Sequence, residues 1–177
     1  VRLADCTPDI VANLELLLQA APNILIKTSP LLDINLAIKE LNHVKAVYAV
    51  GYDQECKELL FHIQKGHEGE AVLHACVVDN QGYPRYSLQF DRNEEHFAQI
   101  HLSGSQSYLY EPHAAVLKSG AFKVLGERYG VNKLAMSSHL YTSNDLVANF
   151  PGRAFEIIGV AKPDANEIRK MTQSDKA

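Results

Sequence analysis

The sequence has few cysteines and no long apolar run, and each shortage argues against a class of protein. Its three cysteines, Cys6, Cys56 and Cys76, are odd in number and form no C-x-x-C pair. This predicts reduced thiols in a cytoplasmic protein rather than a disulfide framework. No apolar run approaches the roughly 18–20 residues that cross a bilayer. No charged-then-apolar leader opens the chain, so we expect no export signal.

Motifs that hold nucleotides and metals are also missing. There is no G-x-G-x-x-G turn after a strand and no G-K-[ST] loop, so the chain predicts no nucleotide-binding turn of its own. The eight histidines form neither H-E-x-x-H nor a Cys/His set with zinc spacing, and we predict no metal site. Ser29 and Ser103 lack a nucleophile elbow. Cys6 precedes a helix start that could lower its pKa, although a buried inert thiol is the favoured interpretation.

Composition is ordinary for a globular protein, with 46% hydrophobic and 21% charged residues. The 177 residues suffice for one large domain or two small ones. A net charge of -4 gives no general support for nucleic-acid binding, so any polyanion site needs a local basic patch. The chain opens with "VRLADCTPD" and no Met, and we expect it to be part of a longer protein.

Residues 1–65 have the pattern of alternating helices and strands. Thr7-Pro8-Asp9 predicts a helix start, with a hydroxyl N-cap and Pro at the first helical position. A strand "ILIKTSP", a helix from about Leu32 to Leu41 and the strands "VKAVYAV" and "KELLFHI" follow. This order predicts the later part of a doubly wound α/β sheet that ends in an antiparallel pair.

From about His67 the pattern changes to a small α+β module. "AVLHACVVD" and "RYSLQF" predict a hairpin, and "DRNEEHFAQIHLSGSQ" an irregular connection. "SYLYE" predicts a strand that ends at Glu111, followed by one helix from Pro112 to a C-cap at Gly130. "RAFEIIGVA" then predicts a strand, and "PDANEIRKMTQ" a final helix.

The stretch "SYLYEPHAAVLKSGAF" has two interpretations. The favoured one places the Glu111 carboxylate at the helix start, where it would contribute ~0.3–1 kcal/mol; the other makes it a substrate contact. The nearby aromatic residues fit either a nucleic-acid surface or core tyrosines with hydrogen-bonded hydroxyls. These aromatic residues are Tyr108, Tyr110, His113, His139 and Tyr141.

Several segments together resemble a known family. They are "LADCTPD", "IKTSPLLD", "CKELLF", "YLYEPHAAVLKSGAFKVLGERYGVNKLAMSSHLYTS" and "NFPGRAFEIIGV". In order and over the whole chain, they resemble the C-terminal part of bacterial class I S-adenosylmethionine-dependent methyltransferases that carry a THUMP-like domain. The resemblance implies that residues 1–66 end a Rossmann-like methyltransferase sheet. Residues 67–177 would then form a small α+β THUMP-like domain, truncated at its C-terminus.

The resemblance also implies a function for the parent protein. The family's cofactor glycines and its Asp-Pro-Ala-Arg-Arg motif do not occur here, so the catalytic residues and most of the S-adenosylmethionine pocket are expected upstream of Val1. This chain alone is expected to be inactive. THUMP domains proper bind RNA, so RNA is the implied substrate, held in position by the C-terminal module. Two alternatives remain open: a structural or oligomerisation module of a methyltransferase that acts on a small molecule or protein, and a non-catalytic binding scaffold.

Candidate site residues follow from these interpretations. Lys27, Thr28 and Ser29 are predicted to line a cleft, because sites in such sheets gather at the carboxyl ends of strands. A second set is predicted to contact substrate: Tyr108, Tyr110, Glu111, His113, His139, Tyr141, Lys118 and Lys123, with Arg128 and Lys133 as further basic residues.

Overall fold

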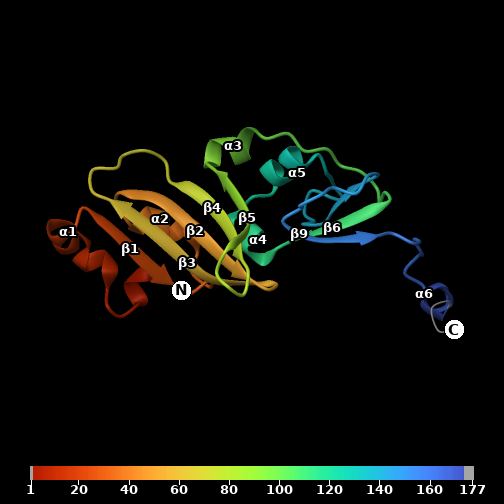
Figure 1. Cartoon of the computed structure of the whole chain (residues 1–177), viewed down its shortest axis with the longest axis horizontal. Coiled ribbons are helices and arrows are strands. Elements are labelled where there is room, and N and C mark those ends of the chain that lie inside the picture. The colour runs from red at the N-terminus through yellow and green to blue at the C-terminus, as the bar shows by residue number, and fades with distance from the viewer. Residues whose placement is uncertain (1, 174–177) are drawn as a thin grey trace.

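Two β-sheets lie side by side in the computed structural model, which describes residues 2–173 (Figure 1). The first sheet has five strands in the order β1-β3-β2-β4-β5. They are β1 (Asn23–Thr28), β2 (Val44–Tyr52), β3 (Glu55–Gln64), β4 (Val72–Val78) and β5 (Pro84–Phe90). The second sheet has four strands in the order β7-β8-β6-β9. They are β6 (Tyr108–Pro112), β7 (Asn132–Lys133), β8 (Tyr141–Ser143) and β9 (Gly152–Glu156).

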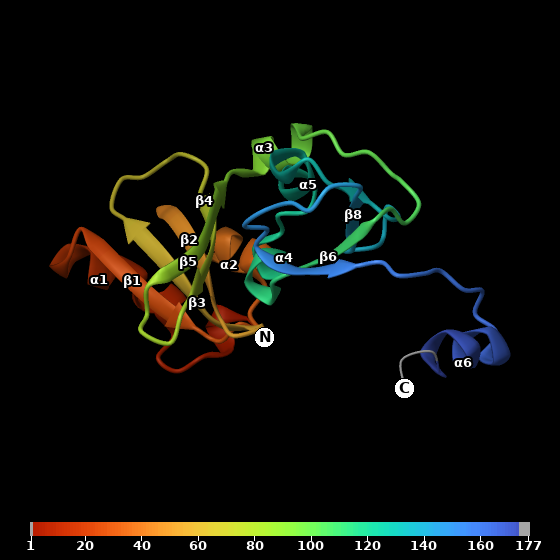
Figure 2. The same ribbon diagram turned by 45° about the vertical axis from the view of Figure 1, so that its right-hand side comes forward.

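One 3-10 helix and six α-helices accompany the sheets in the described residues. They are η1 (Leu3–Asp5), α1 (Ile10–Ala20), α2 (Ile34–Glu40), α3 (Arg92–Phe97), α4 (Ala114–Ser119), α5 (Lys123–Tyr129) and α6 (Ala165–Gln173). The α6 helix extends away from the rest of the molecule in both ribbon views (Figure 2). Within residues 2–173, no helix has the length and apolar character needed to span a membrane.

The strands and helices predicted before residue 65 are present, but the first helix starts differently. Asp9, not Thr7, is the N-cap, because its carboxylate accepts hydrogen bonds from the amides of Val11 at 3.0 Å and Ala12 at 3.1 Å. Pro8 therefore lies before the helix and not at its first position. A carboxylate that reaches two free amides is a stronger cap than a single hydroxyl contact.

The first sheet continues past the predicted division at residues 66 and 67. Strand β3 is antiparallel to both β1 and β2, so β1 and β2 run parallel to each other. Strand β4 then pairs with β2 in parallel, with Ala75 opposite Ala49, and β5 pairs with β4 in antiparallel orientation. The boundary between the sheets consequently lies after Phe90. The hairpin of β4 and β5 covers the edge of β2 that would otherwise be unpaired.

The second half of the chain also packs onto the first sheet. Helices α2 and α4 lie against the same face of that sheet (Figures 1 and 2), and α4 contacts β2, β3 and β4. Ala115 and Val116 of α4 are buried in one apolar cluster with Val47 and Leu73 of the sheet. The two halves of the chain therefore share a continuous core.

The single helix predicted after Pro112 is divided into α4 and α5. Gly120 ends α4 in the left-handed conformation, with φ 86°, which glycine adopts at little cost. Gly130 ends α5 with φ 63°, as predicted. Helix α3 lies in the region predicted to be irregular. A capping box begins it: Asp91 accepts from the Glu94 amide at 2.8 Å, and Glu94 accepts from the Asp91 amide at 2.9 Å.

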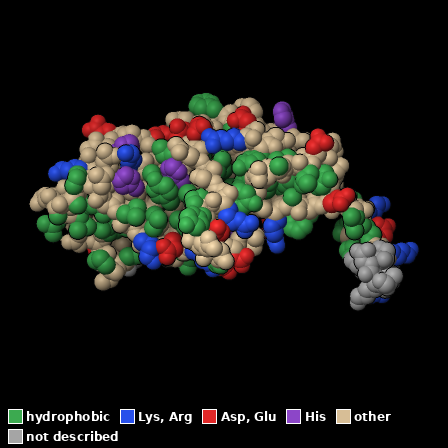
Figure 3. All heavy atoms as spheres, viewed as in Figure 1, with side chains coloured by type: hydrophobic (Ala, Val, Ile, Leu, Met, Phe, Trp, Pro, Cys, Tyr) green, Lys and Arg blue, Asp and Glu red, His purple; other side chains and the backbone are tan. Residues whose placement is uncertain are grey.

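The opposite face of the first sheet is open in the described part of the chain. Over residues 59–64 of β3 the burial alternates, so one face is fully buried and the other is half-buried. On the side seen in Figure 3, hydrophobic and histidine side chains are interspersed over this sheet. Tyr48 and His74 stack there, with ring centroids 4.4 Å apart.

Candidate functional site

A cavity of about 710 Å³ lies where the first sheet meets the helices of the second half. Sites for small ligands commonly measure ~300–1,000 Å³. Both halves of the chain contribute to the walls. The lining residues are Leu31, Asp33, Ile34, Asn35, Leu73, Phe90, Arg92, Glu95, His96, Leu117, Lys118, Ser119, Gly120, Phe122 and Lys123.

The first wall follows the end of β1. The Ser29 hydroxyl accepts a hydrogen bond from the Leu31 amide at 3.2 Å, which turns the chain after the strand. Asp33 then caps α2 by accepting from the Leu36 amide at 3.0 Å. This backbone hydrogen bond is the main reason that the pKa of Asp33 is lowered. The turn and the cap place Leu31, Asp33 and Asn35 on the cavity wall.

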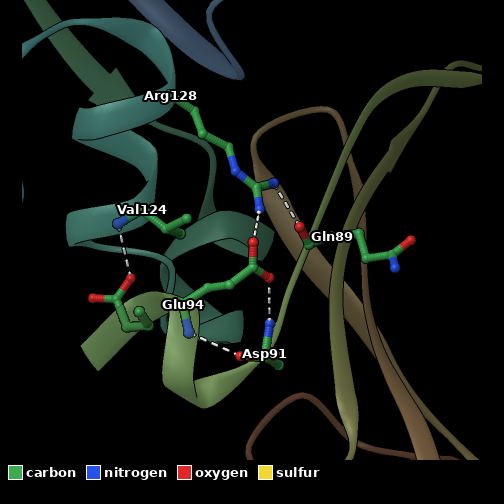
Figure 4. A network of polar contacts seen from close by, with 6 residues as sticks. Gln89, Asp91, Glu94, Val124 and Arg128 are labelled. Atoms are coloured by element: carbon green, nitrogen blue, oxygen red, sulfur yellow. Dashed lines mark hydrogen bonds and ion pairs between the residues drawn. The ribbon is translucent and has the colours of Figure 1, made fainter. Parts of the chain in front are cut away.

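Helix α3 forms the second wall and is held at its first turn. Arg128 of α5 forms an ion pair with Glu94 at 2.7 Å and donates to the carbonyl oxygen of Gln89 at 2.5 Å (Figure 4). Glu94 also completes the capping box with Asp91. These bonds connect β5, α3 and α5, so they hold the elements around the cavity in place relative to one another.

Glu95 of α3 caps the start of α5, although the two are far apart in the sequence. Its two carboxylate oxygens accept hydrogen bonds from the amides of Phe122 at 3.1 Å, Lys123 at 2.8 Å and Val124 at 3.0 Å. The first amides of a helix have no partner within the helix, and an ionised acceptor satisfies them well. The negative charge of Glu95 is therefore engaged by the protein itself.

Three basic side chains line the cavity, and two of them bond to neutral acceptors. Arg92 donates to the side-chain oxygen of Asn35 at 2.5 Å, and Lys123 donates to the carbonyl oxygen of His96. Lys118 lies in the last turn of α4. In the part of the chain that the structure describes, none of these three cations lies within 4 Å of a carboxylate in an ion pair. Lys118 and Lys123, which were predicted as substrate contacts, thus lie together on the wall of one cavity.

Tyr110 and Tyr141 belong to the core. Both are 0% exposed. The Tyr110 hydroxyl donates to the Asp145 carbonyl oxygen at 2.9 Å and accepts from the Val147 amide at 2.9 Å. The Tyr141 hydroxyl donates to the Phe122 carbonyl oxygen at 2.7 Å, and burial raises its pKa. The prediction that these two rings contact substrate is wrong, because a buried ring offers no face to a base.

Glu111 does not start a helix. It lies in β6 and forms an exposed ion pair with Arg153 of the neighbouring strand β9, with Arg153 Nε 3.1 Å from the carboxylate. His113 caps α4 instead: its Nδ1 accepts from the Ala115 amide at 3.0 Å. The helix-start role predicted for Glu111 is therefore wrong, because the strand extends through Pro112 and the cap follows it. His113 is itself buried, at 4% exposure, and bonded within the protein.

The other residues of the predicted contact surface are scattered. Tyr108 is half-buried and packs against the core. His139 is exposed and stacks on Phe122, with centroids 4.4 Å apart. Lys133 is only 5% exposed, donates to the Met136 carbonyl oxygen at 3.0 Å, and has its pKa lowered by burial. With Arg128 paired to Glu94, these residues form no continuous basic surface.

The predicted cleft residues Lys27, Thr28 and Ser29 lie just before the cavity wall and not on it. Lys27 is exposed and pairs with Glu58 at 3.0 Å. The sequence reasoning missed Arg92 and Glu95, because it treated their segment as irregular. The Asp91-x-x-Glu94 capping signature would have located that helix. Across residues 2–173, no group of three or more His, Cys, Asp or Glu side chains is arranged to hold a metal ion.

Comparisons with known proteins give two matches. Residues 108–151 match a family of ferredoxin-like domains. The whole fold matches the crystal structure of a protein from Porphyromonas gingivalis W83 with a TM-score of 0.87 and 31% sequence identity, over 98% of this chain. That protein is described as a "putative methyltransferase". The present chain spans 44% of the length of the Porphyromonas protein. No curated protein matches the sequence.

Two predictions can be compared with these matches. The mixed α/β fold and the relationship to a methyltransferase agree with them. The second half was predicted to be THUMP-like, whereas the family matched there is described as ferredoxin-like. The THUMP-like and class I assignments stay predictions.

Proposed function

We propose that the chain is the C-terminal part of a cytoplasmic class I S-adenosylmethionine-dependent methyltransferase. The observation that carries the proposal is the match to the Porphyromonas protein over 98% of the chain at 31% identity. In this proposal the methyl donor is bound mainly by residues of the parent protein outside this chain, and the catalytic residues lie there too. The parent's remaining chain is then the main partner of the present one.

The free edge of the first sheet supports this arrangement. Strand β1 is the outermost strand, and β1 and β2 run parallel with the antiparallel β3 between them. Leu16 of α1 and Leu25 of β1 are 64% and 62% exposed. An apolar edge beside an open sheet face suits further strands and helices of a Rossmann-like domain.

The second half of the chain would position the acceptor substrate. Methyl transfer depends on alignment of the attacking atom with the methyl group, so a module that fixes the substrate contributes directly to the rate. RNA is the acceptor that the resemblance to THUMP-like proteins implies. The exposed His139 and the cavity residues Lys118 and Lys123 are the predicted contacts that stay accessible in this role.

A second candidate is a methyltransferase that acts on a small molecule or a protein. The cavity of about 710 Å³ favours it, and so does the burial of Tyr110, Tyr141 and Lys133, which removes them from an RNA surface. In this version the second half serves chiefly as a structural module that closes one side of the cavity. A scaffold without catalysis is the third alternative.

A transfer assay with a labelled methyl donor tests the proposal. The longer protein that it requires is incubated with RNA, with a protein fraction and with a small-molecule fraction, and the 177-residue chain serves as the inactive control. We expect the longer protein to label one class of acceptor and the 177-residue chain to label none. If RNA is labelled, its affinity should fall steeply with salt, because phosphate contacts release counterions. Failure of the longer protein both to bind the donor and to label any acceptor would overturn the proposal in favour of a scaffold.

A further inference from the structure

We propose that the cavity between the first sheet and helices α3, α4 and α5 binds a small organic anion, with a phosphate or carboxylate group on an apolar body. The inference rests on the second candidate function only for the ligand's role as methyl acceptor. Binding itself requires no methyl donor and no chemistry. The residues that carry it are Arg92, Lys118, Lys123, Leu117 and Phe122, all on the cavity wall.

The charges around the cavity favour an anion. Three cations line it, and the carboxylates of Asp33 and Glu95 are the two acidic groups on its walls. Glu95 is fully engaged by three backbone amides at 2.8–3.1 Å. Asp33 accepts the amide of Leu36, which holds its pKa low. Each acidic group serves a helix start and stays negatively charged, so three cations against two carboxylates leave the walls a net charge of +1. The cations have no carboxylate partner within 4 Å among the described residues.

The neighbouring bonds leave the cations able to bind a ligand. Arg92 uses Nη2 for the neutral oxygen of Asn35, and Lys123 uses Nζ for the neutral carbonyl oxygen of His96. Such bonds orient a cation without neutralising its charge. An Arg and two Lys around one space suit an anion with several oxygens, because guanidinium can bind two oxygens at once and ammonium acts as a point charge.

The apolar lining favours a ligand that is more than a free ion. Leucine, isoleucine and phenylalanine side chains form much of the remaining wall: Leu31, Ile34, Leu73, Phe90, Leu117 and Phe122. Phe122 carries the stacked ring of His139 on one side, which fixes the orientation of its own ring. A pocket that combines apolar walls with a few charged groups is typical of sites for small organic molecules. The volume suits such a molecule with an aromatic or aliphatic body.

NMR titration of the 177-residue chain tests the inference. The probes are phenyl phosphate, benzoate, inorganic phosphate and the neutral benzyl alcohol. We expect saturable shifts of the amides of Gly120, Phe122 and Lys123 with the two organic anions. Phenyl phosphate should bind about tenfold more tightly than inorganic phosphate, because its ring removes apolar wall from water. The tighter of phenyl phosphate and benzoate identifies the anionic group.

Matched lysine variants supply the control. Lys118→Met removes a cavity charge, and Lys39→Met removes a charge from the last turn of α2, a helix end equivalent to that of Lys118. Both lysines also act electrostatically on Asp33. Lys118→Met should weaken phenyl phosphate binding about tenfold, while Lys39→Met leaves it within about twofold. The amide spectrum of each variant shows whether its fold is retained.

Four results would overturn the inference. They are the lack of saturable shifts at the cavity amides, equal effects of the two lysine variants, equal affinity for benzyl alcohol and phenyl phosphate, and tighter, steeply salt-dependent binding of a short single-stranded RNA to the same amides. The last result would assign the surface to RNA. Because no probe needs a methyl donor, a failure here leaves the methyltransferase proposal standing. An inactive parent with normal probe binding would overturn only the methyltransferase proposal.

Discussion

The Nε2 atom of His113 lies 2.8 Å from the carbonyl oxygen of Asp53. This bond ties the start of α4 to the turn between β2 and β3. The other ring nitrogen, Nδ1, accepts from the Ala115 amide at 3.0 Å, so Nε2 carries the proton and the imidazole is neutral. The ring therefore links the second half of the chain to the first sheet, and it does so in its uncharged form.

Protonation of His113 should weaken the fold. Burial lowers the pKa of His113, and the bond to the Asp53 carbonyl opposes this in part. Because the folded pKa lies below the unfolded value of about 6.5, the unfolded state binds more protons in acid. The stabilisation is complete above pH ~6.5 and is lost as the pH falls through that value toward the folded pKa. Urea unfolding between pH 5 and pH 8 measures it.

The variant His113→Asn isolates this contribution. Asparagine is a good helix N-cap but does not titrate, so the loss of stability in acid should become smaller than in the wild type. It should not vanish, because burial lowers the pKa of His74 as well. An unchanged acid slope would show that His113 does not carry the effect.

Gly51 is the backbone position that admits the His113 ring. A Cβ at Gly51 would lie 2.3 Å from His113 Cε1 and 2.9 Å from the Ala115 Cβ. Gly51→Ala should therefore push α4 off the sheet and reduce the free energy of unfolding by about 1–3 kcal/mol. Gly104→Ala is the control, since nothing lies within 4 Å of its Cβ position. Equal stability of the two variants in chemical denaturation would contradict this packing.

Tyr110 and Tyr141 should affect stability and not RNA binding. Tyr141→Phe leaves the Phe122 carbonyl without its partner and should cost about 1–2 kcal/mol. Tyr110→Phe leaves the Val147 amide without its acceptor, whereas the Asp145 carbonyl keeps its hydrogen bond from the Ser143 hydroxyl, and the change should cost about 1–3 kcal/mol. Thermal melts and RNA titrations of both variants test this. A loss of RNA affinity at unchanged Tm would restore these tyrosines to the contact surface.

Glu95 should be more important for stability than an exposed acid of the same chain. Glu95→Gln removes the charge that three amides of α5 share, and we expect a loss of about 1–2 kcal/mol. Glu68→Gln, at an exposed position, should change stability by less than about 0.5 kcal/mol. Denaturant unfolding compares the two, and equal values would rule out the proposed cap.

Glu111 should contribute little, and only through Arg153. Their ion pair is about half exposed, with side-chain accessibilities of 43% and 50%, so Glu111→Gln should cost at most about 1 kcal/mol. A double-mutant cycle with Arg153→Gln separates the ion pair from a helix-dipole effect. Within the Arg153→Gln background, Glu111→Gln should be neutral. A cost that persists there would restore the helix-start role.

The sequence predicted elements whose signal is local. The strands of the first sheet follow from alternating or continuous apolar residues. The end of α5 at Gly130 was predictable because it depends only on the left-handed conformation of that one residue. Where two neighbouring residues could each serve as the N-cap, the sequence did not show which of them does. Thr7 and Asp9 both suit a helix start, and the choice depends on which side chain reaches the free amides.

Pairings between distant segments could not be predicted in the same way. Alternation marks β4 as a strand but does not say that it joins β2 rather than the second sheet. Glu95 caps a helix that begins 28 residues later in the chain. No short sequence motif predicts a contact over that separation. The cavity depends on these same long-range placements. Lys118 and Lys123 were predicted as substrate contacts, but no local pattern indicates that they share a cavity wall with Arg92.

Calorimetric titration of S-adenosylmethionine tests the methyltransferase assignment most directly, with the 177-residue chain and the longer protein measured side by side. We predict saturable binding to the longer protein and no measurable heat with the chain alone, because the donor pocket is assigned to residues outside it. Tight binding by the chain alone would contradict the assignment, as would a longer protein that binds no donor.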